Sequence, residues 1–301
     1  MGIAPIAPTL MFRDPLAQVD TRKPHIIGPV RTSKHIDVDR HSSPFDKLRV
    51  RTIVESFWSA SLLKNRSVTP APGHVIVQDN RTGKVSYWQK EYHQSAGDAD
   101  GVSTADYIHA MYAFLRQAKS KDVLMIGCGG GTLATMLRRA GVEVTMVDIH
   151  KLSFDIARDY FSLPADVPCH VADGIAYLKK HRRRHDALIL DAFGEGGMPE
   201  KFKTAAFFKL ARSRMTDRAL FLMNVIVDDD EDPTPDNLVR LLRKQWRNVR
   251  LLDTDGWVDR NAVIAAGAVT KLRKPTVLMP PRTGAKKLRK ELAVLDWRAI
   301  R

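Results

Sequence analysis

A cluster of glycines and a following carboxylate carry the clearest chemical signal in this sequence. Glycine fills four of the five positions from 127 to 131, directly after the apolar run 122–126. Without side chains at these positions, backbone N–H groups can close on a bound ligand. Asp148 follows the first glycine at a distance of about 20 residues, the spacing that places a carboxylate on ribose hydroxyls. These residues predict a site for a cofactor that contains a nucleoside.

Two more acids stand after later apolar runs. Asp173, followed by Gly174, comes after the run 169–171, where a carboxylate can accept a hydrogen bond from an adenine amino group. Asp191 follows the run 187–190, at the edge where open α/β sheets keep their ligands. For each acid, capping of a helix or loop is the structural alternative.

The elements that must position these residues alternate between strands and helices. Short branched apolar runs predict buried strands, and apolar residues at helical spacing predict helices between them. This alternation predicts an α/β fold: a doubly wound, mostly parallel, Rossmann-like sheet with helices on both faces. We expect seven strands, of which the last two should pair antiparallel because their connection is short. The expected strands lie at 122–126, 143–147, 169–171, 187–190, 219–227, 249–252 and 262–266.

Changes in composition divide the chain into four regions. Residues 1–70 show little periodicity and are expected to be a poorly ordered basic segment. Residues 71–104 should form a small β region, because a turn signal at 79–83 separates two β-like runs as in a hairpin. Residues 105–270 should form the cofactor-binding catalytic domain. Residues 271–301 are expected to be a basic tail.

The charge of the chain lies in its flanks. The net charge of the chain is +14. Its contents of 44% hydrophobic and 27% charged residues are ordinary for a globular protein. Residues 1–70 carry 11 Lys/Arg against 6 Asp/Glu and residues 271–301 carry 10 against 2, which leaves 27 against 26 between them. Because the predicted fold is nearly neutral, we do not expect specific nucleic-acid binding.

Several further signals concern the location of the protein. No apolar run approaches the roughly 20 residues of a membrane span. The start of the chain lacks the basic and apolar regions of a secretory signal. Cys128 and Cys169 do not make a disulfide framework, and the sequence singles out no metal site. We therefore expect a cytoplasmic protein without a membrane anchor.

The glycine pattern favours an S-adenosyl cofactor over NAD. Dinucleotide-binding loops read G-x-G-x-x-G, whereas the sixth position here is Thr132. Asp173, Asp191 and the final antiparallel strand pair are also unlike a dinucleotide-binding fold. The alternative is that these glycines only allow a strand-to-helix turn and bind no cofactor.

Three stretches of the chain form a recognisable set: Gln94-Ser95 with 107–111, 123–133 with Asp148, and 191–199 with 204–208. Together they resemble the spermidine synthase-like polyamine aminopropyltransferases. That family shares the fold of class I S-adenosylmethionine-dependent methyltransferases. The stretch 191–199, with the Thr-x-x-Phe pattern that follows it, is the most specific of the three, and the resemblance covers about residues 75–266.

The resemblance implies a donor site and an amine site. Gln94 would contact the tail of the donor, Asp148 would hold the ribose and Asp173 the adenine. The donor would be decarboxylated S-adenosylmethionine or S-adenosylmethionine, bound as a co-substrate without a metal. The implied cofactor-binding residues are Gln94, Gly127, Gly129, Gly131, Asp148, Asp173 and Gly174.

Asp191 would be the catalytic carboxylate, and the partner would be a small-molecule amine. His109 would line the amine channel, and Glu195 would be the nearest further acid. The carbon of a sulfonium is already activated, so the amine must only be neutral, aligned and close. An amine with a pKa near 10 is mostly protonated at pH 7, so a carboxylate that accepts its proton helps the reaction. Members of the family often form homodimers.

The sequence departs from the family at two places. The glycine loop has Cys128 and no aspartate for the free amine of the donor, and the second diamine-binding aspartate falls on Phe193 and Gly194. Three functions therefore stay open. The first is aminopropyl transfer, the second is methyl transfer from S-adenosylmethionine, and the third is a silent domain that binds a nucleoside or a partner through its basic flanks. The sequence does not specify the acceptor.

Overall fold

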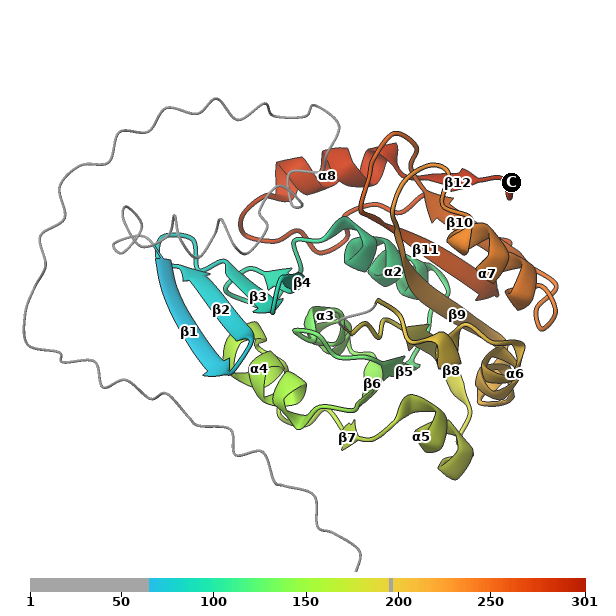
Figure 1. The fold of residues 1–301 in the computed structure, drawn as a ribbon, viewed down its shortest axis with the longest axis horizontal. Coiled ribbons are helices and arrows are strands. Elements are labelled where there is room, and N and C mark those ends of the chain that lie inside the picture. The colour runs from blue at the N-terminus through green and yellow to red at the C-terminus, as the bar shows by residue number, and fades with distance from the viewer. Residues whose placement is uncertain (1–64, 195–196) are drawn as a thin grey trace, which may run out of the picture. The chain divides into compact units, whose positions relative to one another are not determined.

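The computed structural model describes residues 65–194 and 197–301, which form one large and one small β-sheet (Figure 1). Most of the N-terminal region expected to be poorly ordered lies outside the described residues, as does Glu195. Within the part that the structure describes, no helix is both long and apolar enough to cross a membrane.

The large sheet confirms the expected α/β fold. Its described strands follow the order β12-β10-β11-β9-β8-β5-β6-β7. The pairs that join β7, β6, β5, β8 and β9 are parallel, and the pairs that join β9, β11, β10 and β12 are antiparallel. The pairing of the two late strands is therefore antiparallel, as predicted. The bounds are β5 Asp122–Ile126, β6 Glu143–Asp148, β7 Cys169–Val171, β8 His185–Leu190, β9 Met215–Val227, β10 Val249–Asp253, β11 Arg260–Gly267 and β12 Asp296–Arg298.

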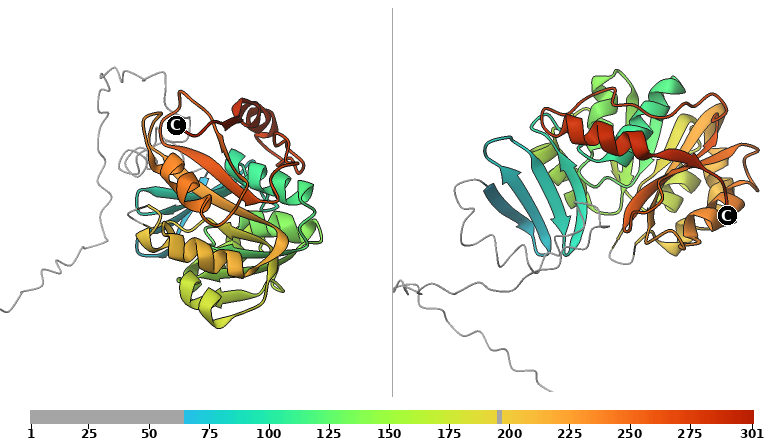
Figure 2. Two further views of the ribbon diagram at one scale, coloured as in Figure 1. Left: turned by 90° about the vertical axis from the view of Figure 1, so that its right-hand side faces the viewer. Right: turned by 90° about the horizontal axis from the view of Figure 1, so that it is seen from above.

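Helices cover both faces of this sheet because alternate strand residues point to opposite sides. In β5, Val123 and Met125 pack with α2, α3, α4 and α8, whereas Leu124 and Ile126 pack with α5, α6 and α7. The two views in Figure 2 show these layers from the side and from above. The helices are α2 Asp106–Gln117, α3 Thr132–Arg139, α4 Lys151–Phe161, α5 Gly174–Lys180, α6 Ala205–Ser213, α7 Thr234–Leu242 and α8 Ala285–Val294, with a short 3-10 helix η1 Glu200–Phe202.

The small sheet is larger than the expected hairpin. It contains four antiparallel strands, β1 Asn65–Ala71, β2 His74–Asp79, β3 Val85–Gln89 and β4 Tyr92–Gly97. The boundary expected at residue 70 falls inside β1. The side chains of this edge strand are exposed or half-buried, and its register is irregular near Pro70. Because no face of the strand is fully buried, its sequence does not need a strict alternation of apolar and polar residues.

The C-terminal segment is part of the fold and not a free tail. Its strand β12 pairs with β10 and makes the large sheet eight-stranded where seven strands were expected. Leu288, Leu292 and Leu295 pack into the core, and the ring of Trp297 stacks on Phe114 with 5.1 Å between centroids. The spacing of apolar residues from 286 to 295 already indicates a helix, and the structure has α8 there, but the sequence gives no sign of β12 or of its pairing with β10.

Candidate functional site

A cavity of about 860 Å³ opens at the carboxyl ends of β5, β6, β8 and β9. β4 of the small sheet forms another part of its wall. The chain leaves β5 for β6 on one side, and β8 lies on the other side of β5, so the cavity is at the point where the strand order reverses. Open α/β sheets bind ligands at this point, and the volume suits a small molecule.

The glycine loop passes close to the end of β8 and to the small sheet. At Gly127 φ is +100°, and an added Cβ would lie 2.0 Å from the main-chain oxygen of Asp191. The N–H of Gly130 donates to Oγ of Ser95 at 2.7 Å, which joins the loop to β4. At Gly129 an added Cβ would lie 2.9 Å from the same Oγ atom. Glycine is therefore required where the loop meets its neighbours.

Asp148 holds the glycine loop against the end of β6. Its carboxylate accepts the N–H of Cys128 at 2.9 Å and the N–H of His150 at 2.8 Å. Burial raises the pKa of Asp148, and these backbone hydrogen bonds partly oppose the rise. Each carboxylate oxygen keeps a lone pair for a further donor such as a hydroxyl. The geometry suits a carboxylate that binds ribose.

Asp191 lies at the cavity wall, directly after β8. Nδ2 of Asn224 donates to Oδ1 of Asp191 at 2.9 Å, and the hydroxyl of Tyr107 donates to the same carboxylate. Burial raises the pKa of Asp191 to about 6, against the lowering effect of these two hydrogen bonds. A base works best when its pKa is near the operating pH. Asp191 is thus mostly ionised at neutral pH but accepts a proton more readily than an exposed aspartate.

The other predicted site residues divide into two groups. Gln94, Gly127, Gly129 and Gly174 line the cavity. Gly131 and Asp173 do not lie among its lining residues. Gly131 caps α3, while Asp173 caps α5 through the N–H of Ala176 at 3.0 Å and pairs with Lys201. Burial raises the pKa of Asp173, but the bonds from Lys201 and Ala176 outweigh it and leave that pKa below its usual value.

The prediction for His109 was wrong. This side chain is fully buried, its Nε2 contacts the main-chain oxygen of Ser103 at 2.7 Å, and it is not among the lining residues of the cavity. The reason is helical geometry: Tyr107 faces the cavity, and a residue two positions later points to nearly the opposite side of α2. Glu195 lies outside the described residues, so its role stays a prediction.

Sequence reasoning missed Tyr107 and Asn224, the two side chains that hold Asp191. Asn224 carries a usable signal, because it is the one polar side chain in the run 219–227, which is otherwise apolar. A polar residue inside a buried strand needs a hydrogen-bond partner. The end of the neighbouring strand, at Asp191, offers such a partner. Tyr107 begins the stretch 107–111 that carries part of the resemblance, but its residue type and spacing do not predict a hydrogen bond to Asp191.

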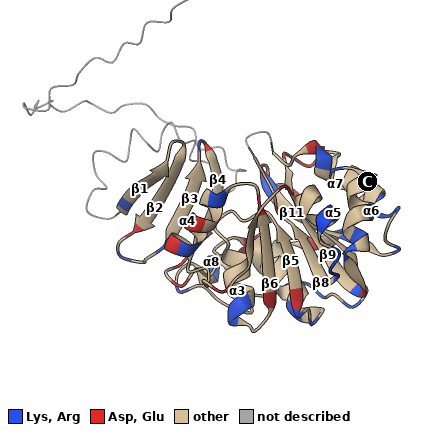
Figure 3. Ribbon diagram, turned by 90° about the horizontal axis from the view of Figure 1, so that it is seen from below, with Lys and Arg blue, Asp and Glu red and all other residues tan. Residues whose placement is uncertain are grey.

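Acids outnumber bases around the cavity. Of the described lining residues, eight are acids and three are Lys or Arg: Glu91, Asp106, Asp148, Asp191, Asp228, Asp232, Asp259 and Glu291 against Lys201, Lys203 and Arg260. Figure 3 shows basic residues elsewhere, for example on α5 and α6. A cavity with this balance attracts cationic ligands.

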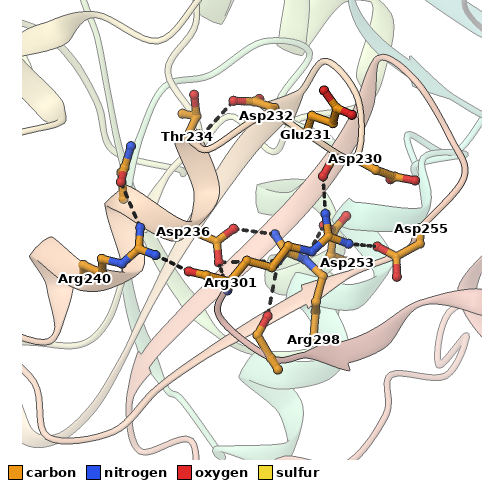
Figure 4. A network of polar contacts seen from close by, with 12 residues as sticks. Asp230, Glu231, Asp232, Thr234, Asp236, Arg240, Asp253, Asp255, Arg298 and Arg301 are labelled. Atoms are coloured by element: carbon orange, nitrogen blue, oxygen red, sulfur yellow. Dashed lines mark hydrogen bonds and ion pairs between the residues drawn. The ribbon is translucent and has the colours of Figure 1, made fainter.

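Near the C-terminus, Arg298 forms ion pairs with acids of α7 and β10 close to one wall of the cavity (Figure 4). The guanidinium of Arg298 contacts Asp236 at 2.9 Å and Asp253 at 3.0 Å. Arg260 contacts Asp253 at 2.8 Å and Asp230 at 3.0 Å. The four side chains of Arg260, Arg298, Asp236 and Asp253 are nearly inaccessible to solvent. Through Asp230, whose side chain is 42% exposed, the network also contacts the loop between β9 and α7, which contributes to the cavity wall.

Comparison with known proteins identifies relatives of the central part of the chain. Residues 106–226 match the family model of the spermine/spermidine synthase domain. The polyamine aminopropyltransferase of Alkaliphilus metalliredigens is 31% identical over 133 residues, which are 40% of this chain and 43% of that protein. The eEF1A lysine and N-terminal methyltransferase homolog of Drosophila melanogaster is 28% identical over 36% of this chain and 18% of its own length. This chain therefore spans less than half of either relative.

The fold also matches solved structures. A probable spermidine synthase from Corynebacterium glutamicum superposes with a TM-score of 0.62 at 16% identity, covering 78% of this chain and 90% of that one. At this identity the match establishes a common fold. The common fold includes the large sheet, whose parallel strands have the cavity at their carboxyl ends.

Proposed function

We propose that this chain, whose residues 106–226 match the family model of the spermine/spermidine synthase domain, transfers an aminopropyl group from decarboxylated S-adenosylmethionine to an amine. The observation that carries this proposal is the Asp191 carboxylate, held by Asn224 and Tyr107 at the wall of a cavity that also contains the glycine loop.

The donor site fits the residues that surround it. Gly127 and Gly129 line the cavity without side chains, which leaves room for an adenosyl group beside the loop. Asp148 can accept hydrogen bonds from ribose hydroxyls. The excess of acids around the cavity suits a donor that carries a sulfonium and an ammonium. When bound, the donor supplies a carbon that is activated by its sulfonium.

Asp191 would perform the acid–base step. Its carboxylate orients the amine by accepting an N–H bond and takes the proton that leaves the nitrogen. A new N–C bond forms as the C–S bond breaks, and the electron pair of the broken bond stays on sulfur as a neutral thioether. Asn224 and Tyr107 keep the carboxylate aimed at the reacting nitrogen.

Methyl transfer from S-adenosylmethionine is the second candidate. Cys128 stands in the loop where the family has an acid for the ammonium of the decarboxylated donor. Burial raises the pKa of the Cys128 thiol well above its usual value, so this side chain stays neutral. The loop thus offers no charge that selects the decarboxylated donor, and one relative of the chain is named as a methyltransferase.

Titration calorimetry with the two donors separates these candidates. We expect the decarboxylated donor to bind at least tenfold more tightly, because S-adenosylmethionine adds a carboxylate to an acidic cavity. Tighter binding of S-adenosylmethionine would contradict aminopropyl transfer and favour methyl transfer.

Turnover is then measured by mass spectrometry with a panel of amines. Asp191→Asn should lower kcat by a factor of about 100 to 10,000. The control variant Asp217→Asn changes an exposed acid that pairs with Arg184 far from the cavity lining, and it should keep wild-type turnover. Unchanged turnover in Asp191→Asn would remove this residue from the mechanism.

A further inference from the structure

The segments that enter three strands of the large sheet gather basic side chains. The strands β8, β9 and β10 run in the same direction, because β8 pairs parallel with β9, while β9 and β10 each pair antiparallel with β11. Their amino ends therefore lie at one edge of the sheet, opposite to the edge that has the cavity. The segments 179–186, 212–218 and 243–248, which we call the basic face, contain 11 Lys and Arg and only two acids. Figure 3 shows basic residues on α5 and α6, the helices that end in the first two segments.

The opposite ends of these strands have the opposite charge. The loops 228–233 and 254–259, which follow β9 and β10, contain seven acids and no Lys or Arg. The nearly neutral total of residues 71–270 thus combines two faces of opposite charge. Our expectation against specific nucleic-acid binding used that total, so it does not cover binding by one face through its charge.

Hydrogen bonds and ring contacts join the three segments of the basic face. Nε of Arg184 donates to the main-chain oxygen of Met215 at 2.7 Å, and Nε of Arg214 donates to that of Leu178 at 2.7 Å. The ring of Trp246 stacks on a phenylalanine of β9 with 5.1 Å between centroids. Since β8 and β10 are three strand spacings apart, the basic face is about 14 Å wide. This width suits an extended polyanion better than a single phosphate group.

Most cations of the basic face have no acid beside them. Two arginines pair with acids, Arg183 with Asp122 and Arg184 with Asp217, whereas the other nine cations form no ion pair within the described parts of the chain. Seven of these nine are exposed, and the other two donate only to main-chain oxygens and to a hydroxyl. Six of the nine are arginines, whose planar guanidinium can bind a phosphate through two parallel hydrogen bonds. The nine are Lys179, Lys180, Arg182, Arg212, Arg214, Arg218, Arg243, Lys244 and Arg247.

An aromatic ring is presented among these cations. His181 stands between Lys180 and Arg182 in the chain, and its ring stacks on that of Tyr177 with 4.2 Å between centroids and 24° between planes. Tyr177 is buried and His181 is exposed, so the stacking holds an exposed ring at the surface. Unpaired bases stack on rings of this kind, including histidine.

We propose that the basic face binds single-stranded nucleic acid without sequence preference. Its phosphates contact the lysines and arginines, and one base stacks on the ring of His181. An acidic peptide would have no use for the exposed ring. A membrane surface is less suitable, because none of the large exposed apolar side chains among the described residues lies in the three segments. None of the three segments lines the cavity, so this binding does not depend on the proposed transfer.

Fluorescence anisotropy with the full chain and labelled oligouridine or oligothymidine tests the proposal. Probes of about 20 nucleotides exceed the usual site of a single-strand-binding groove, and the two probes separate RNA from DNA as the source of the backbone. The variant Lys179→Gln/Lys180→Gln/Arg182→Gln removes three exposed charges. Its Kd at about 0.1 M salt should rise by at least about tenfold. The slope of log K against log salt should become shallower by about 2, since each phosphate contact of a single strand contributes about 0.7.

The matched control is Lys286→Gln/Arg289→Gln/Lys290→Gln on the exposed face of α8. Like the first variant, it replaces two lysines and one arginine, and it lowers the net charge by the same amount. The helices α8 and α5 cover opposite faces of the sheet, so at about 0.1 M salt, where the Debye length is about 10 Å, these charges are screened from the basic face. The control should keep the wild-type Kd within about twofold. Both variants should have the wild-type melting temperature by circular dichroism.

Two variants of His181 separate stacking from charge. His181→Ala should weaken binding by about fivefold, the lower end of the effect of one lost stacked base. His181→Phe keeps an aromatic ring and should retain most of the affinity. An equal loss in both variants would overturn the stacking of a base on this residue, as would tighter binding of a duplex of the same length.

The variants of charge decide whether the basic face is the binding site. Equal losses in the two triple variants would show that binding follows total charge and would overturn the proposal. Unchanged binding in the first variant would overturn it as well. Polyglutamate that binds as tightly as the oligonucleotides would assign the basic face to an acidic protein instead.

A second copy of the chain is the remaining alternative partner, since the loops after β9 and β10 are acidic. Sedimentation velocity at low salt without nucleic acid should show no association that involves the basic face. Copies that associate as wild type and separate as Lys179→Gln/Lys180→Gln/Arg182→Gln would assign this face to self-association and overturn nucleic-acid binding.

Discussion

The raised pKa of Asp191 predicts that replacing this carboxylate stabilises the protein at neutral pH. In the unfolded chain the carboxyl should titrate near the ordinary value of 3.8, whereas burial moves its native pKa to about 6. Between these values the native state keeps a proton that the unfolded chain has lost. The free energy of unfolding therefore falls as the pH rises through this window, and it stays lower above pH 6.

The magnitude follows from the two pKa values. A difference of one pKa unit corresponds to 1.36 kcal/mol, so the shift corresponds to about 3 kcal/mol at most, and to about 2 kcal/mol where cavity water screens the charge. Asp191→Asn imitates the protonated carboxyl, keeps an acceptor for Asn224 and Tyr107, and can donate an amide N–H to Oδ1 of Asn224. The variant should be more stable than wild type by about 2 to 3 kcal/mol at pH 8 and nearly equal to it at pH 4.

Urea denaturation of both proteins between pH 4 and pH 8 measures this difference. The melting temperature at pH 8 should rise by about 4 to 12 °C, given the usual proportionality for chains of this size. Asp217→Asn, at an exposed ion pair, should show no pH-dependent gain. A stability difference that does not change with pH, or a loss of stability at pH 8, would refute the conclusion that Asp191 is a buried acid with a raised pKa.

Two further substitutions test the framework of the cavity. Gly127→Ala should lower the free energy of unfolding by about 4 kcal/mol, because its Cβ would meet the main-chain oxygen of Asp191 at 2.0 Å; Gly141→Ala, with φ +73° but open space, should cost only about 1 kcal/mol. Equal losses in urea denaturation would contradict the close approach. Arg298→Met should cost about 3 to 5 kcal/mol because it leaves Asp236 and Asp253 buried with fewer partners, whereas Arg289→Met on the exposed face of α8 should be nearly neutral. A loss below about 1 kcal/mol for Arg298→Met would contradict a bracing role.

The sequence was most informative where one physical constraint determines both fold and site. The run 122–126 and the glycines after it predict a buried strand and a tight approach, and the structure has both. Asp148 and Asp191 are predictable for the same reason, because each follows a buried strand and the carboxyl ends of parallel strands meet at one edge. Backbone rules of this kind act over a few residues and can be applied to a sequence alone.

Features that depend on contacts between distant segments escaped prediction. His109 is on the helix expected for it, but the direction of its side chain depends on how α2 packs on the sheet. The segment 271–301 reads as a basic tail, yet the partners of Arg298 are acids from positions 236 and 253. An ion pair across such separations leaves no local pattern, because either partner alone is typical of an exposed surface.

Under the proposed transfer, the acids around the cavity differ in how strictly their positions are fixed. Asp191 would have to stay at the end of β8, since proton transfer needs a carboxylate within hydrogen-bond reach of the reacting nitrogen. A charge elsewhere on a bound ligand requires only negative potential at a suitable distance, which side chains from several loops can supply. Asp228 and Asp232 line the cavity from the loop after β9, and the ion pair of Asp230 with Arg260 joins this loop to β11. We therefore expect the carboxylate at position 191 to tolerate no relocation, while acids that supply only potential can be exchanged among neighbouring positions.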